Sequence, residues 1–342
     1  MTETAVSFDN VSIVFGADPK AALPLMDAGQ DRAEIQRDTG QVLGVHNCAL
    51  EVQSGEILVL MGLSGSGKST LLRAVNGLNP VVRGAVHVND GAGMVDVTHA
   101  DEATLRRVRA QHVAMVFQQF GLLPWRSVHE NVGLGLELAG LSAAERGPRV
   151  DAQLKLVGLA DWADRKVEEL SGGMQQRVGL ARAFVTEAPI LLMDEPFSAL
   201  DPLIRTKLQD ELLELQETLQ RTIIFVSHDL DEAFKIGNRI AIMEGGRIVQ
   251  CGTPQEIFSD PATDYVAEFV AHMNPLGVLC ARDVMQPSTV RHAAEVAAEA
   301  DIREVMEAAR KTETPTSVVE NGAVVGEITR ASILGKLLDP RS

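Results

Sequence analysis

Apolar residues along the chain occur in two patterns, short continuous runs and a three- or four-residue spacing. Residues 6–15 are rich in Val, Ile and Phe and predict a strand, whereas the mostly polar stretch 18–41 predicts a short helical insertion. Continuous apolar runs at 57–63, 190–193 and 222–226 predict buried strands. Because strands and helical patterns alternate, the sequence predicts an α/β domain.

The helical stretches have recognisable beginnings. A mostly helical pattern extends from about residue 100 to 185. After the strand at 190–193, Asp201 can cap a helix that starts with Pro202. One face of this helix is predicted to be apolar, with Ile204, Leu208, Leu212, Leu215 and Leu219. Residues 239–250 then predict a hairpin around Gly245-Gly246, and a helix is expected from about Pro254 to Ala271.

The C-terminal part has a pattern of its own. We expect an α/β domain over residues 1–273, a linker over 274–280 and a small module over 281–342. Within the module, a helix is predicted at 295–311, followed by two strands joined at Asn321-Gly322 and a last helix. The sequence therefore predicts a small second α/β unit.

Composition and charge exclude several classes of protein. The 342 residues are 45% hydrophobic and 23% charged, which is the globular range, and 31 basic against 47 acidic residues give a net charge of −16. This balance argues against a general nucleic-acid binder and against adhesion to an anionic membrane surface. Three widely spaced cysteines indicate a reducing compartment, and we expect neither a secretory signal nor a transmembrane segment.

Residues 62–69 read GLSGSGKS, which matches the phosphate-binding pattern GxxxxGK[ST] between a predicted strand and a predicted helix. Gly62, Gly65 and Gly67 allow the backbone to wrap closely around a phosphate, with the helix N-terminus beside it. Lys68 is expected to bridge the β- and γ-phosphates, and the Ser69 hydroxyl to bind Mg²⁺. This loop alone predicts only a nucleoside triphosphate.

An apolar strand that ends in Asp194-Glu195 is the second signal. An Asp-Glu pair at a strand end often forms only a turn, but here Pro-Phe-Ser-Ala-Leu-Asp follows it. Asp194 is expected to hold Mg²⁺ through water, and Glu195 to orient and activate the attacking water. The two signals together predict hydrolysis of the triphosphate.

Residues 170–177, LSGGMQQR, place Ser-Gly-Gly before a helix, where a hydroxyl and free amides can bind an anion. This segment resembles the signature of ATP-binding cassette (ABC) ATPases. Three further segments of the chain resemble motifs of the same family: VFQQF resembles its Q-loop, SALD its D-loop, and the histidine of FVSHD its switch histidine. The resemblance implies a P-loop NTPase fold of the ABC type, with a RecA-like core, an antiparallel β subdomain and a helical signature subdomain.

The resemblance also implies a role for each matched residue. Two ATPase subunits would form a head-to-tail homodimer, and each ATP would lie between one P-loop and the partner's signature. Glu195 would be the general base, with His228 and Gln118 beside the γ-phosphate, the water and Mg²⁺. Phe15 would stack on adenine, whereas Phe8, in the middle of a strand, is expected in the core. The nucleotide and Mg²⁺ would contact Gly62, Ser64, Gly65, Gly67, Lys68, Ser69, Thr70, Gln118, Asp194, Ser171, Gly172, Gly173 and Asp201.

Longer segments, among them MDEPFSALDPLIRTKLQDELLELQ, resemble the ATPases of quaternary-amine importers, and among these the choline-transport ATPase. The resemblance implies an ATPase at the cytoplasmic face of the bacterial inner membrane, held there by permease subunits. A periplasmic or lipid-anchored solute-binding protein would deliver choline, glycine betaine or proline betaine, and no nucleic acid is expected. Residues 122–126 are a candidate contact for the permease, and a segment of the core is the alternative for this apolar stretch. Two alternatives are an importer ATPase for another small solute, such as an amino acid, and a soluble ABC ATPase without a transport role.

Residues 281–338 resemble a single cystathionine-β-synthase (CBS) regulatory unit. Such units usually pair, so this one would pair across the ATPase dimer. The usual nucleotide pattern ends in an aspartate, and here Ser332 stands in its place. A module that only dimerises and a module that senses ionic strength or a nucleotide are both open.

Overall fold

The predicted buried runs lie side by side in a six-stranded sheet with the order β10-β9-β3-β8-β7-β6. Its strands are β3 (Ile57–Met61), β6 (Val113–Val116), β7 (Ile190–Asp194), β8 (Thr222–Val226), β9 (Arg239–Glu244) and β10 (Arg247–Gly252). The pairs β3·β8, β8·β7 and β7·β6 are parallel, in a register that joins Ile57 to Ile223 and Ile190 to Thr222. Because β3, β7 and β8 are fully buried, their sequences are continuous apolar runs.

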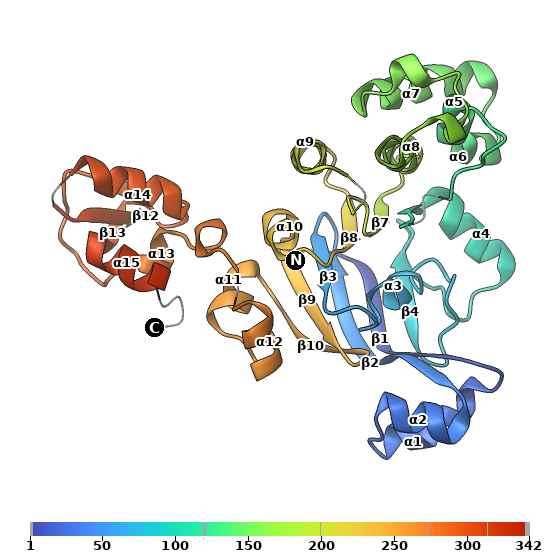
Figure 1. Cartoon of the computed structure of the whole chain (residues 1–342), viewed down its shortest axis with the longest axis horizontal. Helices are drawn as coiled ribbons and strands as arrows, with labels where there is room; N and C mark the ends of the chain where they lie inside the picture. The colour runs from blue at the N-terminus through green and yellow to red at the C-terminus, as the bar shows by residue number, and fades with distance from the viewer. Residues whose placement is uncertain (1–2, 119–120, 199, 272, 313, 339–342) are drawn as a thin grey trace. The chain divides into compact units, whose positions relative to one another are not determined.

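The computed structural model describes residues 3–118, 121–198, 200–271, 273–312 and 314–338. The chain forms two units, one of residues 1–228 and 241–248, the other of residues 229–240 and 249–342 (Figure 1). The domain boundaries expected from the sequence remain a prediction. Among the described residues, no helix is both long enough and apolar enough to cross a membrane.

A second sheet of the first unit is antiparallel and has the order β2-β1-β4-β5. Its strands are β1 (Thr4–Phe15), β2 (Val42–Gln53), β4 (Arg83–Asn89) and β5 (Met94–Asp96). The predicted insertion connects β1 to β2 as η1 (Pro19–Ala22), α1 (Leu23–Asp27) and α2 (Arg32–Thr39). Asp31 and Glu34 form a capping box at the start of α2, and Gly40 ends that helix with φ +69°.

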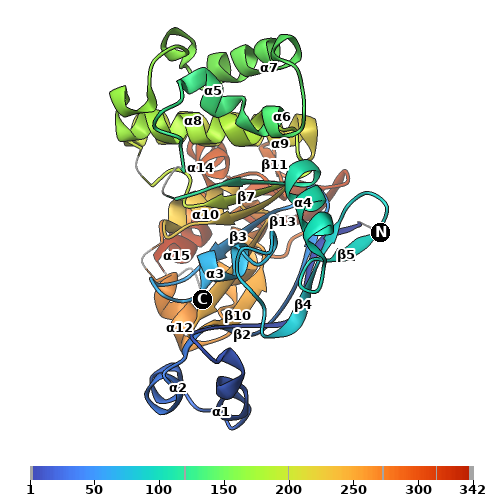
Figure 2. The same ribbon diagram turned by 90° about the vertical axis from the view of Figure 1, so that its right-hand side faces the viewer.

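The remaining helices of the first unit lie between β3 and β8 in the sequence. They are α3 (Lys68–Leu72), α4 (Glu102–Gln111), α5 (Val128–Val132), α6 (Leu134–Leu138), α7 (Ala143–Leu156), η2 (Ala160–Trp162), η3 (Val167–Glu169), α8 (Gly172–Phe184) and α9 (Pro202–Leu219). Helices α5 to α8 gather into one helical subdomain in both views (Figures 1 and 2), around a core that includes Val132, Leu154 and Val178. This subdomain and the antiparallel sheet were both expected from the family resemblance.

Helix α9 confirms its predicted start, because the Asp201 carboxylate accepts a hydrogen bond from the Ile204 N–H at 3.3 Å. Leu208 and Leu212 are buried as expected, whereas the side chains of Leu215 and Leu219 lie outside the described residues. The hairpin is confirmed too. Gly245 and Gly246 both have positive φ, as a two-residue turn between strands requires.

The second unit contains α10 (Leu230–Ile236), α11 (Pro254–Ser259), α12 (Asp264–Phe269), η4 (Pro275–Gly277) and a C-terminal α/β module. The module has a three-stranded sheet with the order β11-β12-β13, in which β11·β12 is parallel and β12·β13 antiparallel. Its elements are α13 (Ala281–Val284), β11 (Glu295–Ala297), α14 (Ile302–Lys311), β12 (Thr316–Glu320), β13 (Ala323–Ile328) and α15 (Arg330–Leu338).

Several predicted elements differ from the structure. The helix expected at 254–271 is two helices, α11 and α12, because Pro261 lacks an amide hydrogen and restricts the residue before it. The helix expected at 295–311 begins at Ile302, where Asp301 caps it, and β11 precedes it. Strand β6 lies inside the stretch that was expected to be helical. Its four residues are too few for the sequence pattern to separate a strand from a helix.

Candidate nucleotide-binding site

The loop between β3 and α3 depends on glycine for its path. Gly62 has φ +140°, and a Cβ built there would lie 2.2 Å from the Met243 carbonyl oxygen. Gly67 has φ +105°, and its Cβ would lie 2.6 Å from the Gly44 carbonyl oxygen. A side chain at either position would collide with backbone, so the glycine pattern of the sequence corresponds to a real steric requirement.

Lys68 begins α3, and its ammonium group lies in the curve of the loop. The Nζ atom donates hydrogen bonds to the carbonyl oxygens of Gly62 at 2.8 Å and Leu63 at 3.0 Å. Burial lowers the pKa of Lys68, and the negative charges of Glu195 and Asp194 act in the opposite direction. A buried ammonium close to two carboxylates is suited to exchange weak carbonyl contacts for a phosphate.

Asp194 is the last residue of β7 and is fully buried. Its carboxylate contacts two side chains of the helix that follows the P-loop. Its Oδ1 accepts a hydrogen bond from the Ser69 hydroxyl at 2.6 Å, and its Oδ2 pairs with Arg73 at 2.8 Å. The structure therefore brings together Ser69 and Asp194, which are 125 positions apart. A hydroxyl beside a carboxylate is the all-oxygen donor set that Mg²⁺ prefers, with water completing the coordination.

Glu195 follows Asp194, and its carboxylate contacts two other predicted site residues. Gln118 Nε2 donates to Glu195 Oε2 at 2.9 Å, and His228 Nδ1 lies 3.4 Å from the same oxygen. The backbone of Glu195 has φ +48°, a conformation that side-chain-bearing residues rarely adopt. Its amide donates to the Val226 carbonyl at 3.1 Å, and Ser198 donates to its carbonyl, so both neighbours fix this turn. The Glu195 carboxylate consequently lies next to Gln118 and His228.

These groups meet because β3, β6, β7 and β8 are parallel and adjacent. The P-loop, Gln118, Asp194-Glu195 and His228 each follow the carboxyl end of one of these strands. Carboxyl ends of parallel strands share one edge of the sheet, where ligands bind in α/β folds. A cleft of about 710 Å³ lies there. It is lined by Phe15, Arg32, Gln36, Val42, Leu43, Gly44, Ser64, Gly65, Gly67, Lys68, Ser69, Thr70, Gln118, Glu195 and His228.

Most predicted nucleotide-binding residues therefore belong to one cleft. Phe15 lies at its wall with 37% of its surface exposed, and its contact with adenine remains a prediction. Phe8 is buried in the core, as expected. The cleft also contains Arg32 and Gln36 of the insertion and Gly44 of β2, which no sequence motif predicted. A capping pattern at Asp31 and Glu34 predicts the start of α2, but it does not show which cleft that helix faces.

The signature residues are not among those that line the cleft. Ser171 caps α8 by accepting a hydrogen bond from the Met174 N–H at 3.4 Å, and both Ser171 and Gly172 are exposed. Asp201 likewise caps α9 at an exposed position. Within a single chain, the structure thus separates the signature Ser171-Gly172-Gly173 and Asp201 from the P-loop.

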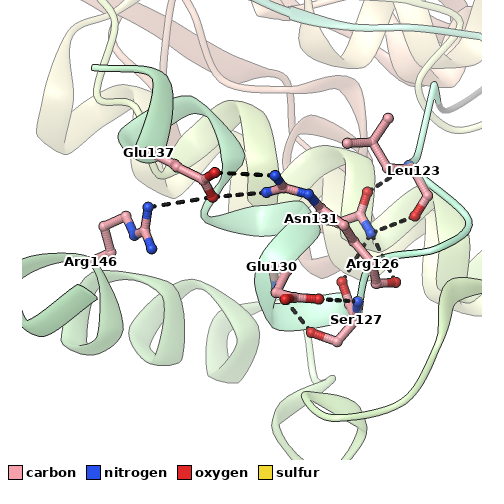
Figure 3. A network of polar contacts seen from close by, with 7 residues as sticks. All are labelled: Leu123, Arg126, Ser127, Glu130, Asn131, Glu137 and Arg146. Carbon is pink, nitrogen blue, oxygen red and sulfur yellow. Dashed lines mark hydrogen bonds and ion pairs between the residues drawn. The ribbon is translucent and has the colours of Figure 1, made fainter. Parts of the chain in front are cut away.

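The segment after Gln118 presents an aromatic side chain on a braced loop. Trp125 is 68% exposed. In the same segment, Asn131 is fully buried, accepts a hydrogen bond from the Leu123 N–H at 2.7 Å and donates to the carbonyls of Leu123, Arg126 and Ser127 (Figure 3). Arg126 forms two hydrogen bonds with Glu137, at 2.8 and 3.1 Å. Residues 123–127 are therefore braced by hydrogen bonds from Asn131, while Pro124 and Trp125 are exposed.

In the C-terminal module, the Ser332 hydroxyl takes part in a local cap. It accepts a hydrogen bond from the Thr329 N–H at 3.1 Å, and the Ser332 N–H donates to the Thr329 hydroxyl at 3.0 Å. These bonds stabilise the start of α15. Membership of the CBS class remains a prediction for this module.

The fold matches one class of known protein. The ABC transporter family model matches residues 45–198. A solved dimeric ATP-binding cassette in a post-hydrolysis state bound to ADP and Pi is 30% identical, with a TM-score of 0.62 over 72% of this chain and 98% of that one. The core, the antiparallel sheet and the helical subdomain are thus those of an ABC ATPase, as the sequence predicted.

Individual relatives define the family further. The glycine betaine/proline betaine transport ATP-binding protein ProV of Salmonella typhimurium is 50% identical over 82% of this chain and 69% of its own length. The trimethylamine N-oxide transport ATP-binding protein TmoW of Ruegeria pomeroyi is 41% identical over 99% of this chain and 98% of its own. The chain belongs to the ABC transporter family as an ATP-binding subunit, an ATPase that energises transport.

Proposed function

We propose that this subunit hydrolyses Mg²⁺–ATP to energise import of an N-methylated amine through a membrane permease. The observation that carries the proposal is the convergence of Lys68, Ser69, Asp194 and Glu195 at one edge of the parallel sheet. Each group fits one demand of phosphoryl transfer: charge neutralisation, metal binding and activation of water.

Each residue of the cleft would have its own role. Lys68 binds the β- and γ-phosphates, and Phe15 stacks on adenine. Ser69, Gln118 and Asp194 would hold Mg²⁺, which neutralises phosphate charge when bound. Glu195 accepts a proton from the attacking water, whose oxygen bonds to the γ-phosphorus as the bond to the ADP oxygen breaks. His228 orients the γ-phosphate and the water.

The separation of the signature from the P-loop supports a homodimeric site. Ser171, Gly172 and Gly173 would bind the γ-phosphate held by the partner's P-loop, and Asp201 would couple the two sites. Neither surface alone surrounds the γ-phosphate, so both chains are needed to stabilise the charge that develops on it. The solved relative with ADP and Pi is itself described as dimeric.

The transported solute would be a methylated amine, because the two relatives are named for solutes of this chemical class. The names of the two relatives specify glycine betaine, proline betaine and trimethylamine N-oxide, all with methylated nitrogen. Choline belongs to the same chemical class. A permease and a periplasmic or lipid-anchored binding protein would select the solute, and the subunit would lie at the cytoplasmic face of the membrane. The loop of residues 122–126, which contains Trp125, would contact the permease.

The substitution Glu195→Gln tests the assignment of the general base. The variant keeps the size of the side chain and loses the basic oxygen, so we expect less than about 1% of wild-type turnover. ATP should still bind and trap a dimer, visible by size-exclusion chromatography with light scattering. Glu102→Gln is the control, since the Glu102 side chain is 90% exposed. Wild-type hydrolysis by Glu195→Gln would contradict the proposed role.

The solute is tested separately with the subunit, its permease and the binding protein in proteoliposomes. We expect choline, glycine betaine or trimethylamine N-oxide to stimulate ATP hydrolysis, and an amino acid to leave it at the basal rate. Stimulation by an amino acid alone would favour the other importer class. Failure to co-purify with any membrane protein would favour an ABC ATPase without a transport role.

A further inference from the structure

The insertion between β1 and β2 sends one arginine to the P-loop. Arg32 is the first residue of α2, and its guanidinium group lines the nucleotide cleft. Its Nη1 donates a hydrogen bond to the Gly65 carbonyl at 2.6 Å, and its Nη2 donates to the Gly44 carbonyl. The side chain therefore joins the insertion both to β2 and to the centre of the phosphate-binding loop.

Glycines leave the space that this guanidinium occupies. A Cβ built at Gly246, in the β9–β10 hairpin, would lie 2.6 Å from Arg32 Nη2. A Cβ built at Gly67 would lie 3.6 Å from the same atom, which places the guanidinium beside the last glycine of the P-loop. The arginine is thus held in a narrow backbone crevice next to the position where phosphates bind.

The charge of Arg32 has no carboxylate partner in the described part of the chain. Its two nearest acidic neighbours in sequence, Asp31 and Glu34, form the capping box of α2 instead. Its Nε atom is buried and forms no hydrogen bond with any described residue. Arg37, on the same helix, differs because it pairs with Asp38 at 2.9 Å and is well exposed. A half-buried cation that lacks an anion is stabilised by a ligand that brings one.

We propose that Arg32 is a nucleotide-binding residue, whose guanidinium braces the Gly65 carbonyl and supplies an unpaired positive charge to the phosphates. The inference rests on the proposed nucleotide cleft, and it gives the insertion a role in setting nucleotide affinity. Arg32 does not reach Glu195 or His228 by any hydrogen bond among the described residues, so its effect falls on binding and not on the chemical step.

The test is calorimetric titration of the full-length protein with ADP, in 50 and 500 mM KCl. For Arg32→Gln we expect the Kd for ADP to rise about tenfold at low salt and by less than about threefold at high salt, because salt screens a charge effect. Arg32→Lys keeps the charge and should stay within about threefold of wild type at low salt. Arg37→Gln is the matched control and should bind ADP like wild type.

Steady-state kinetics give a second measurement. Arg32→Gln should raise KM for ATP and leave kcat within about twofold, and its urea midpoint shows whether the fold is intact. An unchanged Kd, or equal losses in Arg32→Gln and Arg32→Lys at both salt concentrations, would overturn the charge role. The proposed function is judged independently, by ADP binding to wild type and its loss in Lys68→Ala.

Discussion

Asn131 is predicted to be the main support of the loop that presents Trp125. Replacing it with alanine removes three donated hydrogen bonds and one accepted bond, and leaves the Leu123 N–H without its partner. The contact with Arg126, at 3.4 Å, is long and contributes little. The other three hydrogen bonds contribute about 1 kcal/mol net each, and water can partly replace the lost partner of the Leu123 amide. We therefore expect the free energy of unfolding to fall by about 2–4 kcal/mol.

Urea unfolding followed by circular dichroism measures this loss. With an unfolding entropy of about 2.1 cal/mol/K per residue, this loss corresponds for 342 residues to a fall in Tm of roughly 3–6 °C. Trp125→Ala is the matched control, because its side chain is mostly exposed, and we expect a change within about 0.5 kcal/mol. The two variants should converge in function: both should weaken stimulation of ATP hydrolysis by the permease, Asn131→Ala through the loop backbone and Trp125→Ala through the contact surface.

An Asn131→Ala variant that unfolds at the wild-type urea midpoint would refute the reasoning, since the buried amide would then carry no net stabilisation. Loss of stability with unchanged stimulation by the permease would leave the energetics intact, but it would contradict the coupling role of residues 122–126.

Three further predictions concern the thiols and the C-terminal module. Burial raises the pKa of Cys48 and Cys280 to about 11, so at pH 8 only Cys251 should react quickly with Ellman's reagent; rapid modification of Cys48 or Cys280 would contradict this. Because an unfolded thiol ionises near pH 9, stability should also fall between about pH 9 and 11. Deleting residues 279–342 should leave basal ATP hydrolysis within about twofold, and an insoluble product would show that the module belongs to the core fold.

The sequence by itself determined the parts of the site that depend on local conformation. Gly62 and Gly67 occupy positions where a Cβ would strike backbone, so the loop can be recognised from spacing alone. Asp194 follows a continuous apolar run, which marks the end of a buried strand. The caps at Asp201 and Ser171 are equally local, because each involves only the first turn of its own helix.

Tertiary structure decided which of these parts meet. Gln118 and His228 both contact the Glu195 carboxylate because β6, β7 and β8 are adjacent and parallel. Strand order is a property of the whole sheet and not of any single motif. Arg32 lies 33 residues before Gly65, and no local pattern indicates that α2 points it at that carbonyl. Local sequence fixes backbone conformation within a few residues, whereas contacts across the chain depend on packing. The motifs could therefore be identified from the sequence, whereas the role of the insertion could not.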